Sequence, residues 1–245
     1  MSTVLVTGGG SGIGAGLARA FHARGDTVIV ANRTRAGLDA VAADCSGMEV
    51  EDLDVANPAS IAACAERIAA WHPDLDMVVN NAGIQQVLDS TTGDLPTDEA
   101  VGTEIDINLR GLILVSKTVL PVLRRQPRAR LIHVGSGLGY VTLVRAPVYS
   151  ATKAAVHSFS VSLRRQLAGT SVRVIEIIPP VVESGLHRHQ AKAPPRAMPM
   201  GAFVRAAMNG LDAGRDEIPV GLAKVLRIGA RVRPGLFLDI VNKAR

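Results

Sequence analysis

The sequence predicts an α/β fold in which helices cover both faces of one parallel sheet. Short β-branched apolar runs alternate along the chain with alanine-rich stretches of helical length. Consecutive positions within these runs are apolar, as is typical of strands buried on both faces. A length of 245 residues and an apolar fraction of 47% suit a single domain with a well-developed core.

Each expected element is justified by its own residues. The strands are expected at 3–8, 27–31, 48–55, 75–83, 130–136, 172–180 and 217–220, and the helices at 13–24, 35–43, 58–71, 97–124, 147–168 and 201–213. Gly25 ends the first helix, and Asn57 with Pro58 provides an N-cap and a first-turn proline for the third. Because Pro219 has no N–H to donate, we expect the last strand at an edge.

Seven β–α repeats in this order predict a doubly wound, Rossmann-type sheet in three α/β/α layers. We expect residues 1–245 to form one dinucleotide-binding domain without a linker. The segment 184–200 is rich in proline and polar residues and follows the carboxyl end of the sixth strand. That position predicts a substrate-binding lid within the domain.

Composition excludes several classes of protein. No run of about 18 apolar residues is present, so we expect no membrane span, and from the strand-like start we expect no signal peptide. Cys45 and Cys64 lack metal-site spacing, which favours a reduced, cytoplasmic protein and no metal. The net charge is +5, but scattered basic residues and 3% aromatics argue against nucleic acid and favour small anionic ligands.

A glycine-rich turn, TGGGSGIGAG at residues 7–16, joins the first strand to the first helix. Glycine lets the backbone approach a phosphate, and the helix that follows offers free N–H groups and the positive end of its dipole. A structural βα turn is the alternative interpretation. The expected cofactor-binding residues of this turn are Gly8, Ser11, Gly12, Ile13 and Gly14.

The end of the second strand indicates which nucleotide is preferred. An acidic residue about 20 positions beyond the glycines would hold the ribose hydroxyls of NAD. Asn32 stands there instead, followed by Arg33. An arginine can pair with the 2′-phosphate of NADP, and each charge-assisted bond contributes about 1.5–3 kcal/mol. We therefore expect NADP (NADPH), with NAD as the alternative.

Tyr149 and Lys153 in YSATK stand at i and i+4, so a helix places both on one face. Such a pair by itself also fits two polar residues on a solvated helix face. As a reactive pair, the lysine cation would favour the phenolate of a tyrosine whose unperturbed pKa is about 10. Tyr149 would then serve as a general acid or base.

Three motifs in order, TGGGSGIG, NNAG at 80–83 and YSATK at 149–153, resemble the short-chain dehydrogenase/reductase family over essentially the whole chain. The resemblance implies a catalytic set of Ser136, Tyr149 and Lys153 with Asn108, which would hold a water linking the lysine to solvent. It places Asp54 and Val55 beside the adenine, and Asn81, Ala82 and Gly83, with Lys153, near the nicotinamide-side ribose. It also implies a homodimer or homotetramer formed through the helices at 97–124 and 147–168.

The segment after the sixth strand departs from the family pattern, because Pro179 is followed by Pro180 where glycine is usual. By the same match, Val182 would meet the nicotinamide carboxamide and Ser184 would replace a threonine. The IEIIPPVV stretch and the EIPVGLAKVLR ending are similar to a poorly characterised branch named after D-alanylation operons.

The expected function is an NADP-dependent carbonyl reductase or alcohol dehydrogenase. Leu138, Val141, Leu143 and the lid suggest a hydrophobic ketone or secondary alcohol as its small-molecule substrate. Two alternatives remain, a non-catalytic NADP(H) sensor and a non-redox enzyme on the same fold. We expect His133 and His157 to be packing residues, and His187 and His189 to lie in the lid.

Overall fold

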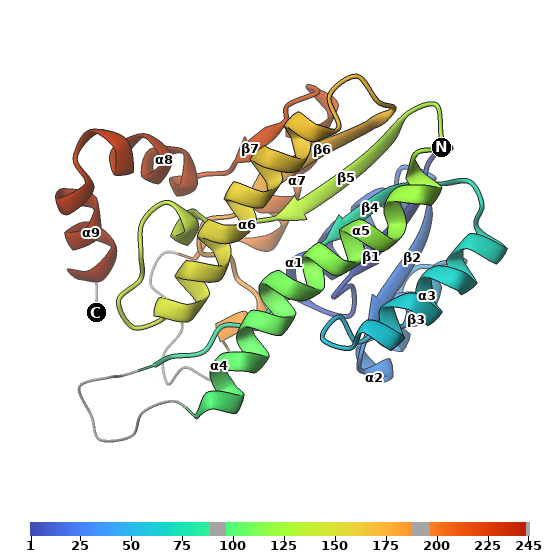
Figure 1. The fold of residues 1–245 in the computed structure, drawn as a ribbon, viewed down its shortest axis with the longest axis horizontal. Helices are drawn as coiled ribbons and strands as arrows, with labels where there is room; N and C mark the ends of the chain where they lie inside the picture. Colours follow the sequence, from blue (N-terminus) through green and yellow to red (C-terminus); the bar gives the residue numbers. More distant parts are fainter. Residues whose placement is uncertain (89–96, 188–196, 244–245) are drawn as a thin grey trace.

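The computed structural model of the protein describes residues 1–88, 97–187 and 197–243. Seven parallel strands form one sheet in the order β3-β2-β1-β4-β5-β6-β7 (Figure 1). Their bounds are β1 Thr3–Thr7, β2 Thr27–Asn32, β3 Glu49–Asp52, β4 Leu75–Asn80, β5 Ala129–Val134, β6 Val172–Ile178 and β7 Glu217–Pro219. The predicted doubly wound sheet is confirmed, and Pro219 lies in an edge strand as expected.

Helices cover both faces of the sheet (Figure 1). They are α1 Gly12–His22, α2 Arg35–Ala43, α3 Pro58–Trp71, α4 Asp98–Ile105, α5 Leu112–Leu123, α6 Pro147–Gln166, α7 Met200–Asp212, α8 Leu222–Val232 and α9 Pro234–Lys243. The Asn57 cap of α3 is confirmed, because its side chain accepts hydrogen bonds from the N–H groups of Ala59 and Ser60.

Successive side chains along each strand point to opposite faces of the sheet, so the core has two layers. Val4 and Val6 of β1 point to the face covered by α1, α2 and α7, whereas Leu5 between them points to the face covered by α3, α5 and α6. Phe21 and Phe203 fill the first layer, and both are fully buried. The sheet is therefore buried on both faces, which explains why its strands are apolar throughout.

One predicted helix and several predicted strands differ from the structure. The expected helix at 97–124 is interrupted by a π-helical turn, η1 Asp106–Gly111, between α4 and α5. Several strands are shorter than expected. The chain leaves the sheet after Asn80, Val134 and Ile178. The segments beyond those ends form loops at the carboxyl edge, where ligands bind in open α/β sheets. Most of the expected lid, 188–196 with His189, lies outside the described residues.

Candidate active site

One large cleft, of about 1360 Å³, follows the carboxyl ends of β1, β2, β4, β5 and β6. It spans the point between β1 and β4 where the strand order reverses. Seventeen predicted site residues line it: Gly8, Ser11, Gly12, Ile13, Asn32, Arg33, Asp54, Val55, Asn81, Ala82, Gly83, Ser136, Tyr149, Lys153, Pro179, Val182 and Ser184. Gly14 and Asn108 do not line it, and neither does Val141, which is buried elsewhere.

The glycine-rich turn is held tightly against the end of β4. The Nδ2 of Asn81 donates to the carbonyls of Thr7 (3.1 Å) and Gly8 (3.2 Å). Gly8 has a positive φ of 65°, and a Cβ there would lie 2.8 Å from the Cα of Ala82. At Gly14 a Cβ would lie 2.3 Å from the Gly8 carbonyl oxygen, so this glycine shapes the turn without facing the cleft.

The first turn of α1 has no side-chain cap, although Ser11 stands at the N-cap position. The first N–H groups of a helix have no partner within the helix and attract anions. Gly12 lies at this end with a φ of 55°, and a Cβ there would approach the Cβ of Ser184 to 3.3 Å. A side chain at Gly12 would therefore narrow the space beside these N–H groups.

Arg33 lies at the mouth of the cleft beyond β2. Its backbone N–H donates to the Oδ1 of Asn32 (3.0 Å), and its side chain is exposed. It forms no ion pair with any residue that the structure describes. The guanidinium is therefore able to meet an anionic group of a ligand.

Tyr149 and Lys153 lie on one face of α6, and both are buried. The Nζ of Lys153 lies 5.7 Å from the centroid of the Tyr149 ring and donates to the Val134 carbonyl at 2.9 Å. Burial raises the pKa of Tyr149 to about 12, although a hydrogen bond with Ser136 lowers it. The phenol of Tyr149 is therefore protonated at neutral pH in this structure, and the expected effect of the lysine and of an oxidised cofactor on the phenolate stays a prediction.

Burial also lowers the pKa of Lys153 to about 8, and the charge of Glu176 opposes this shift. Ser136 lies just beyond β5, and its Oγ accepts a hydrogen bond from the N–H of Leu138 at 3.1 Å. The hydroxyl hydrogen of Ser136 is not used in that bond. The Ser136 hydroxyl also meets the Tyr149 phenol, so the two side chains point at the same place in the cleft.

Asn108 lies in η1 and is fully buried. Its Oδ1 accepts from the N–H of Ile84, and its Nδ2 donates to the carbonyl of the same residue, both at 2.8 Å. A weaker bond of 3.3 Å joins Nδ2 to the Oγ1 of Thr152 in α6. Asn108 thus fixes the chain after β4 to α6. π-Helical turns are frequent at functional sites, and this one aims the amide at Ile84.

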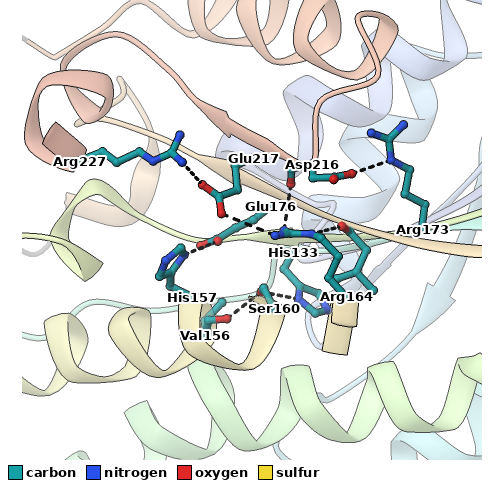
Figure 2. A network of polar contacts seen from close by, with 11 residues as sticks. His133, Val156, His157, Ser160, Arg164, Arg173, Glu176, Asp216, Glu217 and Arg227 are labelled. Carbon is teal, nitrogen blue, oxygen red and sulfur yellow. Dashed lines mark hydrogen bonds and ion pairs between the residues drawn. The ribbon is translucent and has the colours of Figure 1, made fainter. Parts of the chain in front are cut away.

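The two histidines expected to be packing residues are both hydrogen-bonded to neighbouring side chains (Figure 2). His133 is fully buried in β5, and its ring nitrogens contact the hydroxyls of Ser116 (3.0 Å) and Ser160 (2.8 Å). Burial lowers its pKa to about 3, so the ring is neutral at physiological pH. His157 pairs with Glu176 instead.

One wall of the cleft was not expected from the sequence. It comes from the two C-terminal helices and consists of Leu222, Val225, Leu226, Phe237, Ile240 and Val241. In α8, Leu222, Val225 and Leu226 stand at i, i+3 and i+4, a helical spacing that was visible in the sequence. Gln85 and Arg145, which follow NNAG and precede YSATK, also line the cleft.

Comparisons with known proteins agree with the architecture of the site. A family model described as short chain dehydrogenase matches residues 2–194. Oxidoreductase DltE of Bacillus subtilis (strain 168), described as uncharacterized, is 37% identical over 246 residues, which cover 98% of this chain and 96% of the relative. Within the part of the chain that the structure describes, no helix is long and apolar enough to cross a membrane.

Two solved structures are similar over nearly the whole chain. A short-chain dehydrogenase from Sphingobium yanoikuyae in complex with NADPH has a TM-score of 0.82 and 28% identity, covering 98% of this chain and 96% of that one. A short chain dehydrogenase from Burkholderia cenocepacia J2315 in complex with NADP has a TM-score of 0.85 and 26% identity, covering 98% and 97%.

We predict that Gly14→Ala weakens NADPH binding by about fivefold or more. The new methyl group must displace the Gly8 carbonyl from 2.3 Å, and overpacking of this kind costs about 1–3 kcal/mol. Fluorescence titration with NADPH measures the effect. Gly102→Ala in α4 is the control, because a Cβ there meets nothing within 4 Å. Equal affinities for the two variants would contradict the prediction.

Proposed function

We propose that this chain, which belongs to the short-chain dehydrogenase family, is an NADP-dependent carbonyl reductase or alcohol dehydrogenase. The family match confirms the resemblance based on the three motifs and makes the chain an NAD(P)-dependent oxidoreductase. The observation that carries the finer proposal is that Tyr149, Ser136 and Lys153 line the same cleft as the glycine-rich turn.

The residues present fit a dinucleotide. The glycine-rich turn leaves space beside uncapped helix N–H groups for phosphates, and the exposed Arg33 suits a 2′-phosphate. Asp54 and Val55 would border the adenine, and Asn81 to Gly83 would lie beside the nicotinamide-side ribose. Pro179, Val182 and Ser184 would hold the carboxamide end. When bound, NADP supplies or accepts the hydride.

Three side chains would handle the oxygen of the substrate and its proton. Tyr149 is protonated at neutral pH, so its phenol would donate a proton to the oxygen of a carbonyl group. Ser136 would donate a hydrogen bond to the same oxygen and stabilise its developing charge. Lys153 uses one of its three N–H groups on Val134, which leaves two for ribose hydroxyls.

Asn108 would act through the backbone. Its bonds to Ile84 and Thr152 support a helix-shaping role between the end of β4 and α6. The water that Asn108 was expected to hold for Lys153 stays a prediction.

The surroundings of Tyr149 support an apolar substrate. Tyr149, Leu143 and Ala146 form a small buried cluster with Leu138, Leu186 and Val241 packed against it. From Val241 the cleft continues along α8 and α9 to Leu222, Val225 and Ile240, which are 59%, 48% and 50% exposed. An apolar path therefore leads from the tyrosine to the surface, and it suits a hydrophobic ketone or secondary alcohol with a chain attached.

The proposal includes a homo-oligomer and a cytoplasmic location. Ile105 of α4 and Val161 of α6 are apolar and 39% and 36% exposed on the helical regions expected to pack against a second copy. Cys45 and Cys64 are both free, which suits a reducing compartment.

We predict that Tyr149→Phe lowers kcat for ketone reduction by about 10²–10⁴-fold, because the proton donor is lost. NADPH affinity should stay within about twofold, since α6 and Lys153 remain in place. NADPH absorbance with a panel of ketones measures the rate. The matched control is Tyr140→Phe at the other tyrosine, which lies outside the cleft lining. Retained turnover in Tyr149→Phe would refute the assigned role.

We predict that Arg33→Ala reduces the preference for NADPH over NADH by about tenfold or more, the value of one charge-assisted hydrogen bond. Dissociation constants for both nucleotides measure the preference. Arg35→Ala is the control, because Arg35 is also exposed but pairs with Asp39 in the next turn of α2. An equal loss of affinity for NADPH and NADH would show that Arg33 does not bind the 2′-phosphate.

We predict that kcat/KM for 2-alkanones rises by roughly fourfold per added methylene from 2-butanone upward, because each buried CH₂ contributes about 0.8 kcal/mol. Val225→Asp should flatten this series without affecting NADPH binding. Ile228→Asp is the control, since Ile228 is 66% exposed on the same helix but does not line the cleft. A flat series in the unmodified protein would contradict an apolar substrate.

A further inference from the structure

A buried carboxylate lies behind the active site. Glu176 is in the middle of β6, between apolar neighbours, and its side chain is 1% exposed. Its Oε2 lies 2.7 Å from the Nδ1 of His157 in α6 (Figure 2). Burial of an isolated carboxylate is costly, so a partner of this kind is required. The pair joins β6 to α6 beneath the carboxyl edge of the sheet.

The other oxygen of Glu176 meets the turn that carries Ser136. A Cβ at Gly135 would lie 2.3 Å from Oε1, so the carboxylate rests directly against the backbone there. The N–H of Gly135 also donates to the Ile177 carbonyl at 2.9 Å, which binds the turn to β6. Only glycine fits at position 135 while Glu176 keeps this position, and Ser136 is the next residue.

His157 lies one helical turn after Lys153 and is fixed from the same side. The ring of Tyr140 packs edge-on against the His157 ring, with centroids 5.0 Å apart at 73°. Tyr140 follows a short 3₁₀ helix, Gly137–Gly139, that packs on α6. A Cβ at Gly139 would lie 2.8 Å from the Lys153 carbonyl oxygen. The turn after Ser136 therefore touches the backbone of Lys153 itself.

We propose that Glu176 and His157 are a pair of positioning residues that hold the Ser136 turn and the Lys153 face of α6 in register. The inference rests on the proposed function, because it concerns the geometry of that same site. Neither Glu176 nor His157 lines the cleft. The pair acts through Gly135, which does line it, and through the helix.

The charge of Glu176 has an additional effect on Lys153. Burial lowers the pKa of Lys153 to about 8, and Glu176 opposes that shift. The hydrogen bond with Glu176 also raises the pKa of His157, which Glu217 raises further and Arg164 lowers. Loss of the Glu176 charge would therefore lower the pKa of Lys153 further and deplete its ammonium form as pH rises.

Tyr140 and Arg227 complete the surroundings of the pair. Glu176 and Glu217 both raise the pKa of the buried Tyr140 phenol, after the larger effect of burial. Arg227 of α8 and Arg164 of α6 both pair with Glu217, at 2.7 and 3.6 Å (Figure 2). Tyr140 stays neutral, and Glu217 is compensated by two arginines. His157 and Lys153 are thus the titrating groups that respond to Glu176 near neutral pH.

The test is Glu176→Gln, which keeps the shape and an acceptor for His157 but removes the charge. Because the Glu176 charge raises the pKa of Lys153, its removal should weaken NADPH binding several-fold at pH 8.5, where less of the ammonium form remains, and hardly at all at pH 6. The alkaline limb of the kcat/KM profile should move to lower pH. The control is Glu51→Gln, which removes a buried strand carboxylate from its pair with Arg67 and lies outside the cleft lining.

A pH-independent change in NADPH affinity would overturn the electrostatic part of the proposal. The positioning part is tested by Gly135→Ala, which should lower kcat strongly, and by Gly135→Ala with Glu176→Ala, which should recover part of it because the clash is removed. His157→Asn, which keeps an N–H donor, should retain more kcat than His157→Leu. The positioning role would be refuted if the effects of Gly135→Ala and Glu176→Ala on kcat were additive. It would also be refuted if His157→Asn and His157→Leu lost kcat equally.

These results remain separable from the proposed function. NADPH binding is measured without turnover, so its pH dependence tests Glu176 even when the unmodified protein reduces no ketone. Failure of the unmodified protein to reduce any ketone would refute the proposed carbonyl reductase activity but not the role of Glu176. Thermal unfolding of each variant shows whether the fold is intact, and a variant that binds NADPH at pH 6 like the unmodified protein is folded at its site.

Discussion

The hydrogen bond from Lys153 to the Val134 carbonyl is the contact on which the site depends. It joins the buried face of α6 to the last residue of β5 at 2.9 Å, where the chain leaves the sheet toward Ser136. A buried ammonium needs acceptors in place of water, so the lysine fixes α6 relative to β5. Tyr149, one turn earlier on the same face, is thereby placed over the cleft.

Neighbouring polar groups on α6 are satisfied in the same manner. The Oγ of Ser150 accepts from the N–H of Leu143, and the Oγ1 of Thr152 donates to the Tyr149 carbonyl and accepts from Asn108. Ser150 thus ties α6 to the loop before it, and Thr152 ties α6 to η1. Burial that holds the pair in place also favours the neutral phenol, which suits donation of a proton to a carbonyl.

The sequence predicted the sheet and most of the cleft, because both depend on local patterns at strand ends. It did not predict the α8–α9 wall, since α8 starts after Gly221 (φ 53°) without a side-chain cap and its apolar Leu222 and Val225 are 59% and 48% exposed. It did not predict the role of Glu176, because a glutamate in an apolar strand gives no sign of its partner. The partner, His157, is brought to it only by packing of α6 on β6.

The two halves of the cleft are built on different supports. The nucleotide half is fixed by backbone contacts of the glycine-rich turn and β4, whereas the apolar wall stands beside the sheet on α8 and α9 (Figure 1). That wall is anchored by Asn242, which bonds Val144 and Thr142, and by the Phe237 ring against Gly229. Changes in α8 and α9 can therefore alter the substrate while the glycine-rich turn, Lys153 and Glu176 keep the cofactor side unchanged.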